Sequence, residues 1–344
     1  MLPAELDELV SELGQPAYRT QQILDWLYVK GAREIAQMSN LSKSLRSLLS
    51  ERTRITSLLE VDRQESATGE AVKFLFELPT GQRVESVLIV DGDRRTVCLS
   101  SQVGCPLDCK FCATGRMGLI ANLQAGQIVD QLLQVSLYAR ERGERVTNVV
   151  MMGMGEPLLN YDQVVRALRL MRLQGGLGLG GRKITVSTAG YVPGIRKLVA
   201  DDLNVGLAIS LNATTDEIRE KLMPINRKYK IADLLEAARN FFDRRGYRVT
   251  FEYVLMAGLT DLDEDALRLA KLTRDTPCKI NLIPYNELEE DGLYRRPSRR
   301  RLDQFCRLLR DSGTEFTVRE SRGRDIDAAC GQLYHQQEKV RTAL

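Results

Sequence analysis

From about residue 94 onward, short β-branched runs alternate with amphipathic helical stretches, and this alternation constrains the fold more than any other feature of the sequence. Strands that alternate with helices pair in parallel, because each helix carries the chain back to the starting edge of the sheet. The expected strands are 94–100, 146–152, 183–187, 203–210, 249–256 and 279–283. Six such units predict an α/β fold, a partial (β/α)6 barrel, with a final strand at 315–319.

The segments before the barrel have a different pattern. Residues 1–60 are helical in pattern and contain the sole tryptophan, Trp26, so we expect a small N-terminal helical domain. Residues 61–93 contain KFLFEL and RVESVLIV, which indicate a β-rich extension that links this domain to a barrel core at 94–332, followed by a tail at 333–344. Residues 30–54 hold six basic and two acidic side chains, a pattern that fits either a solvated helix face or an RNA contact.

Composition excludes several classes of protein. No apolar run approaches the roughly 20 residues of a membrane-spanning helix, and 43% hydrophobic residues exclude a disordered chain. The first residues, MLPAELDELVSELG, are acidic where a signal peptide is basic and apolar, so we expect a cytoplasmic protein. The net charge of +3 does not by itself indicate nucleic acid, and a single histidine, His335, excludes histidine-based triads and most zinc-enzyme sites.

The strongest chemical signal is the run GCPLDCKFC, which directly follows the first barrel strand. Cys105, Cys109 and Cys112 have the spacing C-x3-C-x2-C. Three thiolates on one short loop suit an iron–sulfur cluster that is held at three of its four irons, with one iron open to a small ligand. A structural zinc site is the alternative, and it needs a fourth ligand from elsewhere in the chain.

This spacing resembles the radical S-adenosylmethionine (SAM) superfamily. The resemblance implies a [4Fe-4S] cluster whose open iron binds the amino and carboxylate groups of SAM, so that an electron from the cluster yields a 5'-deoxyadenosyl radical. The strand at 146–152 ends in GMGEP, which is similar to the superfamily's GGE-type element. Gly155 allows close backbone approach there, and the carboxylate of Glu156 is placed to receive the cofactor's amino group.

Polar residues stand at three further strand ends, where core residues would be apolar. Singly they are typical of turns and caps, but on successive strands they favour one binding site for the ribose and methionine parts of the cofactor. The set assigned to cofactor binding beyond Gly155 and Glu156 is Ser187, Ser210, Leu211, Asn212 and Asn286.

Four longer motifs extend the resemblance to one family. SSQVGCPLDCKFCATG, MGMGEPLLN, LMPINRKY and DIDAACGQL resemble the RlmN family, radical methyltransferases that act on carbon 2 of one adenine in 23S rRNA and, in many bacteria, of the adenine beside the tRNA anticodon. Matching motifs run from the N-terminal domain to Gln332. The resemblance implies that Cys330 carries the methyl group and that Cys98 is its resolving partner, a pairing that spacing alone does not reveal.

The implied reaction uses two SAM molecules per turnover. One methylates Cys330, and the second supplies the radical that takes a hydrogen atom from that methyl group, so that the resulting carbon radical adds to the electron-poor ring carbon. Glu85, in RVESV, matches the family's general base. Cys98 then attacks the sulfur of Cys330, which releases the methylated base and leaves a disulfide that a reductant reopens. An electron donor such as flavodoxin or ferredoxin is implied, and we expect a monomer.

Some residues depart from the family pattern. Asn212 stands where the family commonly has histidine, which weakens the transfer of that cofactor contact. Pro157, in GEP rather than GEA, favours the carbon-2 enzyme over the Cfr-type enzyme that methylates carbon 8.

Two readings from other classes remain as alternatives. A glycyl-radical activating enzyme shares the cluster loop but has no need of Cys98 and Cys330. A zinc-stabilised RNA-binding module is the non-enzymatic alternative, and it predicts colourless protein with one zinc per chain.

The remaining motifs carry less information. The glycines of GLGLGG follow a helix and precede a strand, the reverse of the dinucleotide-binding order, so we interpret them as a loop. The basic run 295–301 fits either an RNA phosphate contact or a solvated loop. Cys278 and Cys306 are expected to be inert core residues, and His335 is assigned no role.

Overall fold

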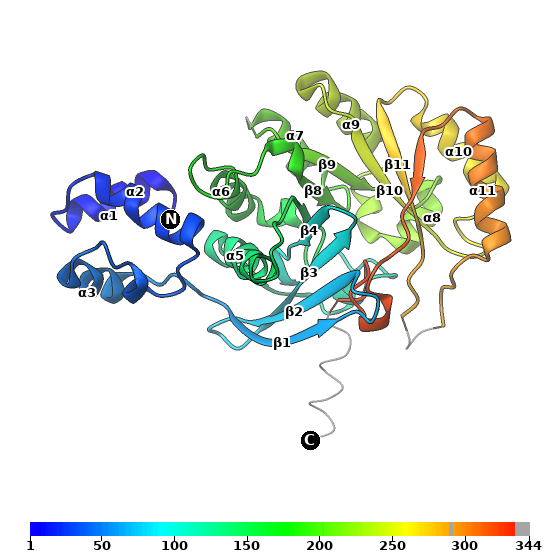
Figure 1. Ribbon diagram of the computed structural model, residues 1–344. Helices are drawn as coiled ribbons and strands as arrows, with labels where there is room; N and C mark the ends of the chain where they lie inside the picture. The colour runs from blue at the N-terminus through cyan, green and yellow to red at the C-terminus, as the bar shows by residue number, and fades with distance from the viewer. Residues whose placement is uncertain (202, 289–291, 334–344) are drawn as a thin grey trace.

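The computed structural model describes residues 1–201, 203–288 and 292–333, and in these residues the chain forms one ten-stranded sheet with helices on its outer side (Figure 1). The sheet has the order β1-β2-β3-β4-β7-β8-β9-β10-β11-β12, so β1 and β12 are its edges. The strands are β1 (Leu59–Glu65), β2 (Ala71–Glu77), β3 (Arg83–Asp91), β4 (Arg94–Cys98), β7 (Asn148–Met151), β8 (Ile184–Thr188), β9 (Gly206–Ser210), β10 (Val249–Leu255), β11 (Cys278–Pro284) and β12 (Phe316–Val318).

The part of the sheet from β4 to β12 is parallel throughout and forms the predicted partial barrel. All seven strands expected there are present, with ends that differ by up to three residues. Amphipathic helices connect them, and each buries one apolar stripe, as Ile128, Leu132 and Val135 do on α5. These helices are α5 (Ala125–Glu141), α6 (Tyr161–Met171), α7 (Val192–Ala200), α8 (Asp216–Leu222), α9 (Ile231–Arg245), α10 (Asp263–Thr273) and α11 (Arg299–Asp311). The α/β fold with a partial barrel is confirmed.

Two local expectations are corrected by the structure. Thr214 followed by Glu217 has the pattern of a capping box, which predicts Thr214 as the cap of α8. The hydroxyl of Thr215 accepts the hydrogen bond from the backbone of Ile218 and caps the helix instead. The hydroxyl of Thr214 donates to Asp265. The second correction is β1, which the sequence did not indicate because exposed and half-buried residues alternate along it without a β-branched run.

The segment 61–93 extends the barrel sheet. β1, β2 and β3 pair antiparallel, and β3 continues onto β4 with Val87 opposite Cys98. Side chains two residues apart on a strand share a face, so Glu85 and Val87 lie on the face of the sheet that also carries Cys98. The extension therefore brings Glu85 to the inner side of the barrel.

The N-terminal helices α1 (Pro3–Glu12), α2 (Tyr18–Leu24) and α3 (Lys43–Arg52) form a small unit beside the sheet (Figure 1). The unit has an apolar cluster of its own, in which Leu6, Val10 and Leu45 are buried. Its contacts with the barrel include the ion pair of Glu5 with Arg166 at 2.7 Å and the apolar packing of Leu2 and Tyr28 against the main core. No helix of the described residues is long and apolar enough to cross a membrane.

One buried arginine, Arg219, connects neighbouring strands of the barrel near their carboxyl ends. The Arg219 side chain is fully buried, and its guanidinium donates to the carbonyl oxygens of Ala189 (2.7 Å), Ser210 (3.0 Å) and Leu211 (3.0 Å). These carbonyls stand where β8 and β9 end. Burial lowers the pKa of Arg219 to about 10, which leaves it charged at neutral pH.

We expect Arg219→Met to destabilise the fold by about 3 kcal/mol or more, because the buried carbonyl oxygens lose their donors. Arg227→Met is the matched control, since the Arg227 side chain is 71% exposed, and it should change the stability by no more than about 0.5 kcal/mol. Urea denaturation followed by circular dichroism measures both. Equal denaturation midpoints for the two variants would show that Arg219 does not hold the strand ends.

Candidate active site

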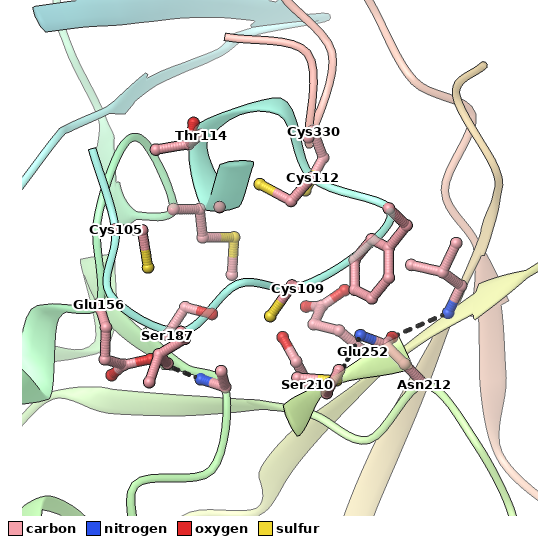
Figure 2. A pocket seen from close by; sticks show the side chains of 18 of the residues that line it. Cys105, Cys109, Cys112, Thr114, Glu156, Ser187, Ser210, Asn212, Glu252 and Cys330 are labelled. Carbon is pink, nitrogen blue, oxygen red and sulfur yellow. Dashed lines mark hydrogen bonds between the residues drawn. The ribbon is translucent and has the colours of Figure 1, made fainter. Parts of the chain in front are cut away.

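The three clustered cysteines lie on a loop over the carboxyl rim of the barrel. The chain leaves β4, forms β5 (Gln102–Gly104), passes through the cysteine loop and the short helix α4 (Ala113–Arg116), and returns in β6 (Leu119–Asn122), which pairs with β5. Gly104 has φ +72°, and a Cβ there would lie 1.9 Å from the carbonyl oxygen of Gly118, so this turn requires glycine. Figure 2 shows Cys105, Cys109 and Cys112 facing one cavity.

That cavity, here called the rim cavity, has a volume of about 150 Å³. Burial raises the pKa of all three thiols, to about 12 for Cys105. Among the described residues, no group of three His, Cys, Asp or Glu side chains is arranged to bind a single metal ion. A cluster binds each thiolate through a different iron, so three thiols that face one cavity from separate positions fit such a cluster.

Glu156 forms the part of the rim cavity nearest the end of β7. Gly155 precedes it with φ +97°, where a Cβ would lie 2.5 Å from the side chain of Gln102. The carboxylate accepts hydrogen bonds from the backbone of Leu158 (3.1 Å) and Ala189 (2.7 Å). Burial raises the pKa of Glu156 to about 7, against the effect of these hydrogen bonds.

The predicted polar residues of the strand ends come together, with one exception. Ser187, Ser210, Asn212 and Asn286 all line the rim cavity. Leu211 does not, because its side chain is fully buried in the apolar core between sheet and helices. Asn212 accepts from the backbone of Val254 at 3.0 Å, whereas the Oδ1 atom of Asn286 is buried and has no partner in the described structure.

Cys330 reaches the rim cavity on the loop that follows β12. The Asn286 side chain donates to the carbonyl oxygen of Cys330 (3.2 Å), and the backbone of Ala113 donates to that of Gly331 (2.8 Å), which fixes this loop on the cysteine loop. Cys330 is open to solvent, yet the protein atoms around its sulfur raise the pKa of the thiol to about 11.

Cys98 lies near Cys330 although 232 positions of sequence number separate them. Burial raises the pKa of Cys98 to about 12, and the neighbouring Cys330 adds to this increase. The sequence alone contained no signal for this proximity, because it arises from the position of β4 in the sheet and the path of the last loop.

Glu85 lies outside the rim cavity and is buried on β3. Its Oε1 atom stands 3.6 Å from Nζ of Lys73, which is also buried. The sequence analysis missed Lys73, although a lysine inside the apolar run AVKFLF is a signal of a buried ion pair. It also missed Glu252 and Arg319, two charged residues that line the rim cavity.

The basic run 295–301 is partly engaged within the protein. Arg296 pairs with Glu320 at 2.5 Å, Arg299 with Asp303 at 3.3 Å, and Arg301 with Asp263. The glycine motif lies in the loop between α6 and β8, as expected. His335 falls outside the described residues.

Comparisons with known proteins define the class. The sequence-family model of the radical SAM superfamily matches residues 99–270. That of the ribosomal RNA large subunit methyltransferase N-terminal domain matches residues 1–55. A radical SAM methyltransferase from Sphaerobacter thermophilus superposes with a TM-score of 0.95 at 45% identity, over 97% of this chain and 98% of that one. The fold and the cysteine loop are thus those of a radical SAM methyltransferase.

Two curated relatives identify the family. The probable dual-specificity RNA methyltransferase RlmN of Desulforamulus reducens is 44% identical over 97% of this chain and 95% of its own length. That of Bacillus cytotoxicus is 44% identical over 98% of this chain and 93% of its own length. The chain belongs to the RlmN family.

Each cysteine of the loop is expected to be required for the cluster. Anaerobic reconstitution of the wild-type protein should give about four irons and four sulfides per chain with a brown colour, and replacement of Cys105, Cys109 or Cys112 by alanine should abolish this. Cys278→Ala is the matched control, because Cys278 does not line the rim cavity. Iron analysis and absorption spectra measure the cluster content of each variant. A colourless wild-type protein with one zinc per chain would contradict the prediction.

Proposed function

We propose that this protein methylates carbon 2 of a specific adenine in 23S rRNA, and of the adenine beside the tRNA anticodon, through a methylated Cys330 and a transient disulfide with Cys98. The observation that carries the proposal is that Cys330 faces the same cavity as the three clustered cysteines while Cys98 lies beside it. A glycyl-radical activating enzyme does not account for this pair. Pro157 favours carbon 2 over the carbon 8 of Cfr-type enzymes.

The residues present fit a [4Fe-4S] cluster held by Cys105, Cys109 and Cys112 and a SAM molecule bound beside it. Gly155, Glu156, Ser187, Ser210, Asn212 and Asn286 are the residues proposed to bind SAM. The amide of Asn286 has a free buried acceptor for this purpose, and Glu156 offers a carboxylate to the amino group. When bound, the cluster and two SAM molecules per turnover supply the methyl group and the radical chemistry that activates it.

Each remaining step belongs to a residue of this chain. The Cys330 sulfur carries the methyl carbon to the base. Glu85 accepts the proton that the ring carbon loses, and Nζ of Lys73 lies 3.6 Å from its Oε1 atom. The thiolate of Cys98 then attacks the Cys330 sulfur. A disulfide forms, and the sulfur–carbon bond breaks with its electron pair passing to the base-bound methylene carbon. This carbon takes up a proton to become the methyl group, and the methylated base leaves.

The proposed setting is a cytoplasmic monomer that receives electrons from a donor such as flavodoxin or ferredoxin. A cytoplasmic setting suits the chemistry, since reducing conditions reopen the disulfide after each turnover.

The decisive experiment compares wild type with Cys330→Ala and Cys98→Ala. Reconstituted protein, methyl-labelled SAM, a reductant and 23S rRNA fragments react anaerobically, and mass spectrometry analyses the nucleosides. Wild type should form 2-methyladenosine and Cys330→Ala none, whereas Cys98→Ala should accumulate RNA covalently linked to Cys330 because the resolving thiol is missing. Formation of 8-methyladenosine would place the protein with the Cfr-type enzymes.

The proposed role of Glu156 makes SAM binding depend on pH. With its pKa raised to about 7, the carboxyl is protonated and neutral below that pH and ionised above it. The affinity of the cluster-loaded protein for SAM should therefore be highest above about pH 8 and fall as the pH drops through 7. Equilibrium dialysis at several pH values measures this. Glu156→Gln should bind SAM more weakly, and its affinity should not depend on pH in this range. A wild-type affinity for SAM that stays the same from pH 6 to pH 8 would contradict the assignment.

A further inference from the structure

A second, larger cavity of about 670 Å³ lies within the barrel and meets the rim cavity. Inward-facing residues of successive strands line it, including Thr96, Thr185 and Thr250. The three clustered cysteines and the residues proposed to bind SAM do not line this inner cavity. The two cavities share five residues, which are Met152, Glu252, Ile283, Arg319 and Cys330.

The shared residues mark where the target base must meet the enzyme. Cys330 has to touch the base in the proposed reaction, so the base must reach the junction of the cavities. Two of the other four shared residues, Glu252 and Arg319, carry charges. A charged side chain at such a junction is costly to bury unless a polar group of a ligand or of the protein meets it.

Glu252 presents an unused acceptor. It lies on β10 and is only 6% exposed, and Figure 2 shows its side chain pointing into the rim cavity. Its Oε1 atom accepts from Asn281 at 3.1 Å, and Asn281 in turn accepts from Thr317 at 2.5 Å, which fixes the carboxylate in place. Its Oε2 atom is buried with no hydrogen-bond partner among the described residues. A buried acceptor of this kind needs a polar partner, and a ligand bound at the junction of the cavities can supply one.

Arg319 presents unused donors. In the described part of the chain, its guanidinium makes a single hydrogen bond, a long one of 3.8 Å to the sulfur of Met152. It interacts electrostatically with Glu252 and with both Cys98 and Cys330. A rigid acceptor and a multiple donor therefore line the same junction of the two cavities as the sulfur that reacts.

We propose that Glu252 and Arg319 recognise the Watson–Crick edge of the target adenine, with Glu252 accepting from the 6-amino group and Arg319 donating to N1. The inference rests on the proposed function and extends it to the recognition of the base. Along this edge carbon 2, N1 and the carbon that bears the amino group follow one another, and their proposed partners are Cys330, Arg319 and Glu252.

Glu252 and Arg319 together explain both the selection of adenine and the reactivity of its carbon 2. Guanine presents a carbonyl oxygen in place of the amino group, and this oxygen repels a carboxylate, so the pair rejects guanine. A guanidinium hydrogen bond to N1 draws electron density from the adjacent carbon 2. That carbon thus becomes more receptive to an electron-rich carbon radical attached to sulfur.

Substrate analogues and variants test the two contacts separately. The substrates are two 23S rRNA hairpins that carry adenosine or purine ribonucleoside, which lacks only the amino group, at the target position. The full-length, cluster-loaded wild type should prefer adenosine by at least about tenfold in methylation and in hairpin affinity measured by fluorescence anisotropy. Glu252→Gln should reduce this preference to about twofold or less. Arg319→Gln should lower the affinity for both hairpins by the same factor, since both bases contain N1.

Thr250→Val is the matched control, because Thr250 lies two residues from Glu252 on the same face of β10 and lines the inner cavity only. It should keep the wild-type preference. Equilibrium dialysis gives the SAM affinity of each variant, which should not change. Loss of SAM affinity in Glu252→Gln with the base preference intact would assign the carboxylate to the cofactor and overturn the proposal, as would a wild type that does not distinguish the hairpins. If the wild type methylates neither RNA, the proposed function fails, and the affinity comparison still decides the role of Glu252.

Discussion

Parallel pairing from β4 to β12 is the constraint on which the site depends. Because these strands run in one direction, their carboxyl ends meet at one rim, and residues from distant parts of the sequence form layers across the sheet. Glu252 pairs with Ser210 on one side and with Asn281 on the other. Arg219 stabilises the rim by holding the carbonyls where β8 and β9 end, so the polar side chains that follow those strands have fixed positions.

The antiparallel extension performs a second task, because it anchors the loop that carries Cys330. Asp325 accepts hydrogen bonds from the hydroxyl of Ser66 and the backbone of Ala67, in the turn between β1 and β2. Arg322 pairs with Glu70 at 2.9 Å and Asp91 at 2.6 Å. The extension also contributes the buried Lys73–Glu85 pair. Strands outside the barrel thus position both the candidate base and the cysteine proposed to carry the methyl group.

Local patterns in the sequence were enough to predict the strands of the barrel, the cysteine loop and Glu156. Each depends on neighbours within about ten residues, as the spacing of Cys105, Cys109 and Cys112 illustrates. Contacts that depend on the folded path were not predictable from pattern. Resemblance alone paired Cys98 with Cys330. The Leu211 side chain does not reach the cavity, because residues adjacent on a strand point to opposite faces and Ser210 faces the cavity. A charged residue in the buried strand VTFEYVL was a usable signal for Glu252, and it was overlooked.

The charged residues around the two cavities affect when the thiols of Cys98 and Cys330 can react. The pKa values of Cys330 and Cys98 are raised to about 11 and 12, so both are neutral thiols at neutral pH and weak nucleophiles when the protein is at rest. Arg319 acts in the opposite direction on both, since its positive charge favours their thiolates. A base that engages Glu252 brings a neutral polar partner to the carboxylate without removing the charge of Arg319. The guanidinium then remains close to both thiols. The side chain proposed to position the base therefore also favours the thiolate that is proposed to release it.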